Sequence, residues 1–265
     1  MHTRYKTIIC VCLSVILAGA SITGLIILIA FVVHMRDRFE GHVSPGDTYT
    51  LDGVEHTLDI VNHPGRRKWY PLLRSERAAE FKHMYRTLED VCARHGIDVW
   101  VSGGTLLGAI RHQGFIPWDD DMDVHVRVTD VPRLLGPDTK QDLLANGLKC
   151  QTCDRLDVIK VVRTDTLNKM FIDVLAEGRV GDHWGTCAND ITQHPPRCDQ
   201  LHPNEMWREE DVFPLQRVPF EDIEVWIPHR PHVMLDTQYG KHVMQSYPST
   251  LSFHFLDQLA IYKDL

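Results

Sequence analysis

Four aspartates fall within five consecutive positions of this 265-residue chain, and no other stretch of it is as rich in potential chemistry. They are Asp119, Asp120, Asp121 and Asp123. On an extended strand the side chains alternate between two faces, so Asp119, Asp121 and Asp123 would share one face and the apolar residues between and after them the other. Neighbouring carboxylates repel, and a hard cation with oxygen ligands relieves that repulsion. We therefore predict a divalent metal site, with Mg²⁺ or Mn²⁺ as cofactor; the alternative is a solvated acidic turn.

A glycine pair lies a short way upstream of the aspartates. Gly103 and Gly104 follow a predicted strand and, with Thr105, open a predicted short helix. Glycine lets a ligand approach the backbone closely, and the start of a helix presents N–H groups to an anion. We interpret these three residues as a cradle for the phosphates of a donor, although a glycine pair after a strand also suits a simple turn.

A third carboxylate and several cations complete the candidate site. Asp173 lies in the apolar stretch MFIDVL, where an aspartate is costly unless it is paired or binds a metal. It is the third predicted ligand, with a capping or salt-bridge role as the alternative. Lys160, Arg163 and Arg111 are candidates for binding donor phosphates, although each also suits an ordinary surface position.

Hydrophobic periodicity predicts the α/β (α+β) elements that must position these residues. A helix is expected over 75–95, and strands are expected over 97–101, 119–128, 157–163, 170–175 and 220–227. A further short helix is expected over 231–240. Residues 177–208 mix Gly, His, Pro and Cys, and we expect a long irregular loop there.

The N-terminus predicts a membrane anchor. Residues 8–33 form an uncharged apolar run, longer than the apolar part of a cleaved signal peptide and long enough for a transmembrane helix. Basic residues flank the run on both sides, so charge alone does not settle its orientation. We expect a tail over 1–7, the span over 8–33, a stem over 34–70 and a catalytic domain over 71–265.

Charge and cysteine content limit the remaining classes. The formal net charge is −8, which argues against bulk nucleic-acid binding. Charged residues make up 24% and hydrophobic residues 43%, which excludes wholesale disorder. Cys187 and Cys198 are a candidate disulfide if the domain lies in an oxidising compartment, with zinc ligation and free thiols as the alternatives.

The stretch SGGTLLGAIRHQGFIPWDDDMDVHV resembles the signature of the LicD family, which includes bacterial phosphocholine transferases, fukutin and fukutin-related protein. FIDVL and the segment from DVFPL to DTQYG resemble later parts of the family, so the resemblance covers roughly residues 75–245. It implies a nucleotidyltransferase-like mixed sheet flanked by helices. It also implies transfer of ribitol-, glycerol- or choline-phosphate from a CDP-linked donor to a glycan hydroxyl.

The resemblance also implies roles for individual residues. Asp121, Asp123 and Asp173 would bind the metal, and Asp119 would be a ligand or a base. Gly103 and Gly104 would lie near the donor phosphates. It further implies a single-pass type II membrane protein of the Golgi or ER with a luminal catalytic domain. Two alternatives remain open: an Asp-x-Asp sugar-nucleotide glycosyltransferase, and a membrane-anchored pseudoenzyme that binds a glycan or a partner transferase. The oligomeric state, the phospho-alcohol and the acceptor are not predicted.

Overall fold

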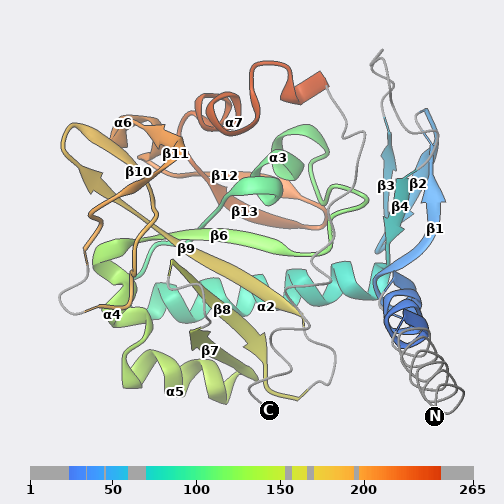
Figure 1. Ribbon diagram of the computed structural model, residues 1–265, viewed down its shortest axis with the longest axis horizontal. Helices are drawn as coiled ribbons and strands as arrows, with labels where there is room; N and C mark the ends of the chain where they lie inside the picture. The colour runs from blue at the N-terminus through green and yellow to red at the C-terminus, as the bar shows by residue number, and fades with distance from the viewer. Residues whose placement is uncertain are drawn as a thin grey trace, which may run out of the picture.

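Strand β9 (Phe171–Val180) organises the main sheet because it pairs with three other strands. The computed structural model describes residues 24–33, 35–44, 46–58, 70–152, 157–165, 170–193 and 197–245. Among them a seven-stranded mixed sheet is flanked by helices, which confirms the α/β class expected from the sequence (Figure 1).

The sheet combines parallel and antiparallel pairs. The first half of β9 lies between β6, to which it is parallel, and β8, to which it is antiparallel, and its second half pairs with β10. The other members are attached at the edges: β5 to β6, β7 to β8 and β11 to β10. The strands of this sheet are β5 (Trp100–Val101), β6 (Met122–Arg127), β7 (Leu148–Thr152), β8 (Val158–Arg163), β9, β10 (His183–Cys187) and β11 (Leu201–Trp207).

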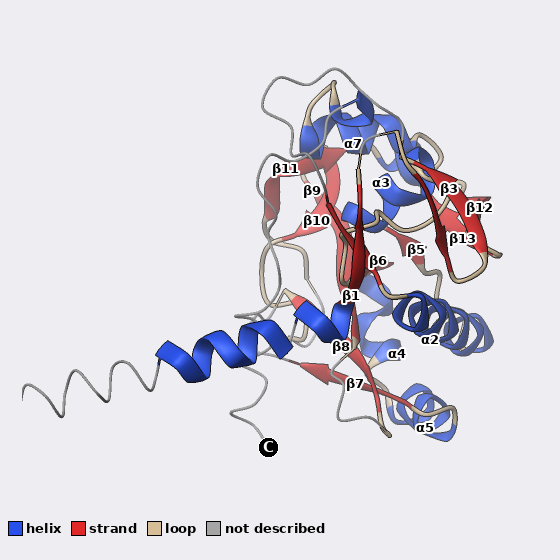
Figure 2. Ribbon diagram, turned by 90° about the vertical axis from the view of Figure 1, so that its right-hand side faces the viewer, coloured by secondary structure: helices blue, strands red, loops and turns tan. Residues whose placement is uncertain are grey.

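The helices lie in two groups on either side of the central strands. In both ribbon views α3 and α7 lie above these strands, and α2 and α5 lie below them (Figures 1 and 2). The helices are α2 (Ser75–Arg94), α3 (Gly103–Arg111), α4 (Val131–Leu134), α5 (Pro137–Ala145), α6 (Glu209–Val212) and α7 (Pro231–Tyr239), with 3-10 turns η1 (Val128–Asp130) and η2 (Val243–Gln245).

The core forms where the predicted periodicities place it. The helix expected over 75–95 is α2, and its residues at three- and four-residue spacing, from Ala78 to Cys92, are buried. Met122, Val124 and Val126 of β6 are also buried. Burial of these apolar side chains supplies the main driving force that holds the sheet against its helices.

Two sequence expectations were wrong in detail. Residues 177–208 are not one irregular loop, because they contain the end of β9 and the strands β10 and β11. The single strand expected over 220–227 is instead a hairpin of β12 (Gln216–Phe220) and β13 (Ile223–Ile227). A turn with Glu221 at φ 54 reverses the chain between them, and the residue type gave no sign of this turn.

The residues expected to form a stem contribute to the folded unit. Helical residues 24–33 and 35–38 lead into β1 (Phe39–Val43), which pairs with β4 (Tyr70–Leu73). A second hairpin follows, with strands β2 (Thr48–Leu51) and β3 (Val54–Thr57), and it places Leu51 and Leu58 in the core. The remaining stem residues 59–69 lie outside the described residues, as do the tail 1–7 and residues 246–265.

The predicted membrane span is described only from residue 24 onward. Within the described parts of the chain, none of the helices combines the length and the apolar character needed to cross a membrane.

Candidate active site

Two neighbouring parallel strands bring three carboxylates together. Asp123 of β6 pairs in register with Asp173 of β9, so their side chains lie on the same face of the sheet. One carboxylate oxygen each from Asp121, Asp123 and Asp173 lie within 4.8 Å of one another. A second group overlaps the first, because Asp119, Asp120 and Asp121 meet the same distance criterion. Asp121 therefore belongs to both groups.

The aspartates reach this place by a turn followed by a strand. The strand expected to begin at Asp119 begins at Met122, so the strict alternation of faces does not extend to Asp119–Asp121. The Asp119 N–H instead donates to the carbonyl of Ile116 at 2.9 Å. A turn gathers consecutive carboxylates more tightly than a strand does, which accounts for the crowding in the second group.

The glycine pair packs directly against two of these carboxylates. A Cβ atom on Gly103 would lie 2.7 Å from Asp123 Oδ2, and one on Gly104 would lie 2.6 Å from Asp119 Oδ2. Gly103 also has a φ of +53°, which disfavours other residues. The start of α3 and the carboxylate groups are thus in contact, and the absence of side chains makes that contact possible.

The N-terminus of α3 carries further polar groups toward the site. The Thr105 hydroxyl accepts a hydrogen bond from the Asp123 N–H at 2.9 Å. Ser102 precedes the helix, is buried, and its hydroxyl has no hydrogen-bond partner among the described residues. The first N–H groups of a helix also have no intrahelical acceptor. These donors suit an anionic ligand that approaches the carboxylates together with a cation.

The electrostatics of the carboxylate cluster favour the addition of positive charge. Burial raises the pKa of Asp119 well above its usual range, and the charges of Asp121, Asp123 and Asp120 raise it further. In the protein alone, Asp119 therefore favours uptake of a proton. A divalent cation would relieve the same repulsion.

The residues fit a hard divalent cation. Asp121, Asp123 and Asp173 supply carboxylate oxygens, which are the ligands that Mg²⁺ and Mn²⁺ prefer. Burial is the larger cause of the raised pKa of Asp119, and the charges of Asp121 and Asp123 add to it, so negative charge gathers beside this set.

Of the three predicted phosphate-binding cations, Lys160 reaches the carboxylates. Its Nζ lies 2.7 Å from Asp173 Oδ1, so Asp173 has both the salt-bridge role and the place in the cluster that the sequence left as alternatives. Arg163 lies elsewhere, with ion pairs to Glu80 on α2 and to Asp165.

Arg111 lies at the opposite end of α3 from Gly103. Its Nε donates to His112 Nε2 at 2.9 Å, and its Nη1 donates to the Val243 carbonyl at 3.1 Å. The nine residues of α3 put roughly 12 Å of helix between the glycine pair and this end.

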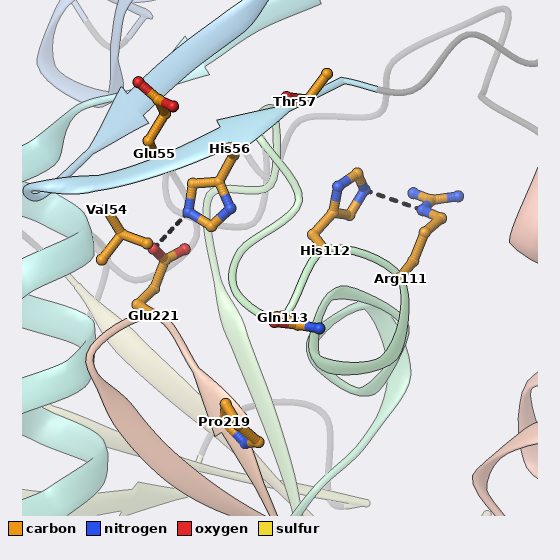
Figure 3. Close-up of a pocket in the computed structure, with 9 residues that line it drawn as sticks. All are labelled: Val54, Glu55, His56, Thr57, Arg111, His112, Gln113, Pro219 and Glu221. Carbon is orange, nitrogen blue, oxygen red and sulfur yellow. Dashed lines mark hydrogen bonds and ion pairs between the residues drawn. The ribbon is translucent and has the colours of Figure 1, made fainter.

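A pocket of about 330 Å³ opens beside that end of α3 (Figure 3). It lies between β3, the residues after α3 and the turn of the β12–β13 hairpin, and none of the clustered aspartates lines it. On its wall His56 Nε2 lies 2.7 Å from Glu221 Oε2. Burial, together with the charges of Arg111 and His56, lowers the pKa of His112 to about 3, so His112 is neutral at physiological pH.

Sequence reasoning missed Tyr239, which lies near the clustered aspartates, and Glu205, which lies near Tyr239. Tyr239 ends α7, and its hydroxyl pKa is raised by burial and by Asp123 and Asp119, although 48% of the residue is exposed. The burial that matters is local to the hydroxyl. Glu205 of β11 also raises this pKa, and its buried Oε2 has no hydrogen-bond partner among the described residues. The Tyr-Gly ending of the helix was visible in the sequence, but Glu205 had no local signal.

The predicted cysteine pair is joined in the structure. Cys187 at the end of β10 and Cys198 form a disulfide, with 5.3 Å between their Cα atoms. Gly178 of β9 lies against it, since a Cβ there would be 2.6 Å from Cys198 Cβ. Cys92 and Cys150 are free. The disulfide closes the segment that was expected to be an irregular loop.

Comparison with known families agrees with the fold and with the position of the cluster. The family model described as "LicD/FKTN/FKRP, nucleotidyltransferase domain" matches residues 96–230, a little over half of the chain. The matched region includes α3, the aspartates and β9, and its description defines the class as a nucleotidyltransferase domain. This chain belongs to the LicD family.

Individual relatives match over shorter or more divergent stretches. An uncharacterized protein of Rickettsia prowazekii is 24% identical over 196 residues, which is 69% of this chain and 64% of the relative. The lipopolysaccharide cholinephosphotransferase LicD of Haemophilus influenzae is 51% identical over 45 residues, 17% of each protein. Ribitol 5-phosphate transferase FKRP of Homo sapiens is 50% identical over 36 residues, 14% of this chain and 7% of the relative. The matches thus span less than two thirds of these relatives' own length.

Proposed function

We propose that this chain is a metal-dependent phosphotransferase of the LicD family. It would move a ribitol-, glycerol- or choline-phosphate group from a CDP-linked donor to a hydroxyl of a glycan. The observation that carries the proposal is the contact between the start of α3 and the carboxylates of β6 and β9. Two relatives with short, strong matches are named as phospho-alcohol transferases, which supports this choice of group.

The clustered aspartates and the glycine pair would have different roles in this reaction. Asp121, Asp123 and Asp173 would hold the divalent ion. Once bound, the ion supplies positive charge to the donor's diphosphate. The N–H groups of Gly103 and Gly104 would orient the phosphate oxygens, and catalysis would rest mainly on positioning and electrostatics.

Asp119 is the proposed base. The acceptor oxygen forms a bond to the phosphorus that carries the alcohol, and the bond from that phosphorus to CMP breaks. The proton of the acceptor hydroxyl passes to the Asp119 carboxylate, and CMP leaves with the electron pair of the broken bond. A raised pKa suits a carboxylate that must accept a proton near neutral pH.

We also propose that the chain is a type II membrane protein with its catalytic domain in the lumen of the Golgi or ER. The apolar run over 8–33 supports an anchor, as does the exposure of every large apolar side chain between Leu25 and Val33. The Cys187–Cys198 disulfide supports an oxidising compartment.

A donor screen tests the proposal. The full chain in detergent is incubated with Mg²⁺ or Mn²⁺, a glycan acceptor mixture, and CDP-ribitol, CDP-glycerol or CDP-choline, and then with UDP- and GDP-sugars. The proposal predicts CMP release and a phospho-alcohol adduct by mass spectrometry, both abolished by EDTA. Sugar transfer would instead favour the glycosyltransferase. No turnover with any donor, while the metal still binds, would favour the pseudoenzyme.

A further inference from the structure

The end of the N-terminal helix contacts the loop that carries Asp119, Asp120 and Asp121. Arg38 is the last helical residue before β1, and its guanidinium forms an ion pair with the carboxylate of Asp120. The same guanidinium lies 3.3 Å from the Asp120 carbonyl oxygen. Both residues are buried, with 2% and 3% of their surfaces exposed. This pair joins residues that are 82 positions apart.

The surrounding contacts hold Arg38 in place. Its carbonyl accepts the Arg74 N–H at 2.9 Å, and the next residue on β1 pairs with Leu73 of β4. Leu73 in turn donates its N–H to the carbonyl of Pro117, at the start of the aspartate loop, at 2.6 Å. The preceding residue, Asp37, forms an ion pair with α2, in which its Oδ2 lies 3.2 Å from Arg77 Nη1. The junction between helix and domain is therefore attached at several points.

Arg38 binds a member of one of two carboxylate groups that overlap at Asp121. Asp121 belongs both to the group with Asp123 and Asp173 and to the group with Asp119 and Asp120. Either group offers three oxygens at a spacing that suits a cation. With the guanidinium of Arg38 on Asp120, the second group is partly neutralised and one of its carboxylates already has a cationic partner.

We propose that Arg38 is a positioning residue that selects between these two groups, by engaging Asp120 so that the cation binds at Asp121, Asp123 and Asp173. This inference rests on the proposed function, because it concerns the ion that transfer would need. Arg38 lies outside residues 96–230, so the family match does not assign it a role.

A role of Arg38 in placing the ion can be distinguished from a purely electrostatic effect of its charge, because only the first moves the ion to other ligands. Removing a positive charge beside an acidic cluster should tighten cation binding. If Arg38 selects the group, Arg38→Met should also move the ion toward Asp120 and slow transfer at least tenfold, as changes behind metal ligands commonly do. If Arg38 merely stabilises the fold, binding and transfer would fall together with thermal stability.

The experiment compares full-length variants in detergent by Mn²⁺ electron paramagnetic resonance, Mn²⁺ titration, thermal melting and CMP release. Arg36→Met is the matched control, because Arg36 is exposed and lies two positions away. Arg38→Met should change the Mn²⁺ spectrum without weakening Mn²⁺ affinity. Arg38→Met combined with Asp120→Asn should restore the wild-type spectrum and most of the transfer rate, because it removes the competing carboxylate along with its partner.

The outcomes separate this inference from the proposed function. Identical Mn²⁺ spectra in wild type, Arg36→Met and Arg38→Met would overturn the selection by Arg38. Loss of the signal of protein-bound Mn²⁺ in the double variant would also overturn the selection, because Asp120 would then be a required ligand. This readout does not depend on whether Arg38→Met alone folds. If the spectra behave as expected but wild type transfers nothing, the proposed function fails and the inference stands.

Discussion

Adding one methyl group at Gly104 should separate catalysis from stability. A Cβ there would lie 2.6 Å from Asp119 Oδ2, whereas ordinary van der Waals contact begins at about 3.4 Å. The carboxylate must therefore retreat by about 0.8 Å. A displacement of about 1 Å in a reacting group costs on the order of 100-fold in rate, so Gly104→Ala should lower kcat by about that factor.

The same substitution should not weaken the fold or the metal site. Gly104 has no positive φ, and alanine in place of glycine stabilises a helix by up to about 1 kcal/mol. Asp119 is outside the group formed by Asp121, Asp123 and Asp173, so Mn²⁺ affinity should be retained. Gly103→Ala should differ, because its Cβ would displace Asp123 and weaken Mn²⁺ binding.

The assay measures CMP release, Mn²⁺ affinity and the thermal midpoint on the same preparations. Gly147→Ala is the control for backbone strain, since Gly147 has a φ of +79° and nothing within 4 Å of its added Cβ. It should lose some stability and keep wild-type turnover. The reasoning would be refuted if Gly104→Ala kept the wild-type kcat. It would also be refuted if the loss of kcat came with a clear fall in the thermal midpoint.

Three further predictions concern charge, pH and the disulfide. Asp123→Asn should lower kcat by about 100-fold or more, because it removes a proposed metal ligand. It should not lower the melting temperature, because it also removes one of several repelling charges. The control Asp138→Asn, at an exposed position, should leave both kcat and the melting temperature unchanged. The pKa of Asp119 is raised in the folded protein, so metal-free stability should fall as pH rises above the ordinary aspartate range, and Mg²⁺ binding should release a proton. Calorimetry in two buffers of different ionisation enthalpy measures that proton, and a buffer-independent enthalpy would contradict it. Replacing Cys187 and Cys198 by serine should lower the free energy of unfolding by about 2–3 kcal/mol in denaturant titrations, and an unchanged midpoint would show that the crosslink contributes nothing.

Local patterns predicted the elements that bury one apolar face. The spacing from Ala78 to Cys92 gave α2 nearly to the residue, and alternation in MDVHV gave β6. Asp173 was singled out because a carboxylate among apolar residues needs a partner, and the structure places it beside Lys160 and in register with Asp123; its role as a metal ligand stays a prediction. The predictions of α2 and β6 succeeded because each depends on a short stretch of chain.

The remainder depends on contacts between distant segments. Nothing near Arg38 in the sequence indicates that it meets Asp120, and nothing near Arg163 indicates that it turns toward Glu80. Residues 177–208 have the composition of a loop, yet strand pairing with β9 and a disulfide give them order that composition does not show. The charge of a side chain was readable from the sequence, but its partner was set by tertiary packing.

The most direct test of the central claim is anomalous diffraction from crystals of the protein grown with Mn²⁺. The account predicts one manganese peak for each chain, coordinated by Asp121, Asp123 and Asp173 and facing the start of α3. A peak elsewhere, or no peak at these carboxylates when Mn²⁺ and a CDP-linked donor are both present, would contradict it.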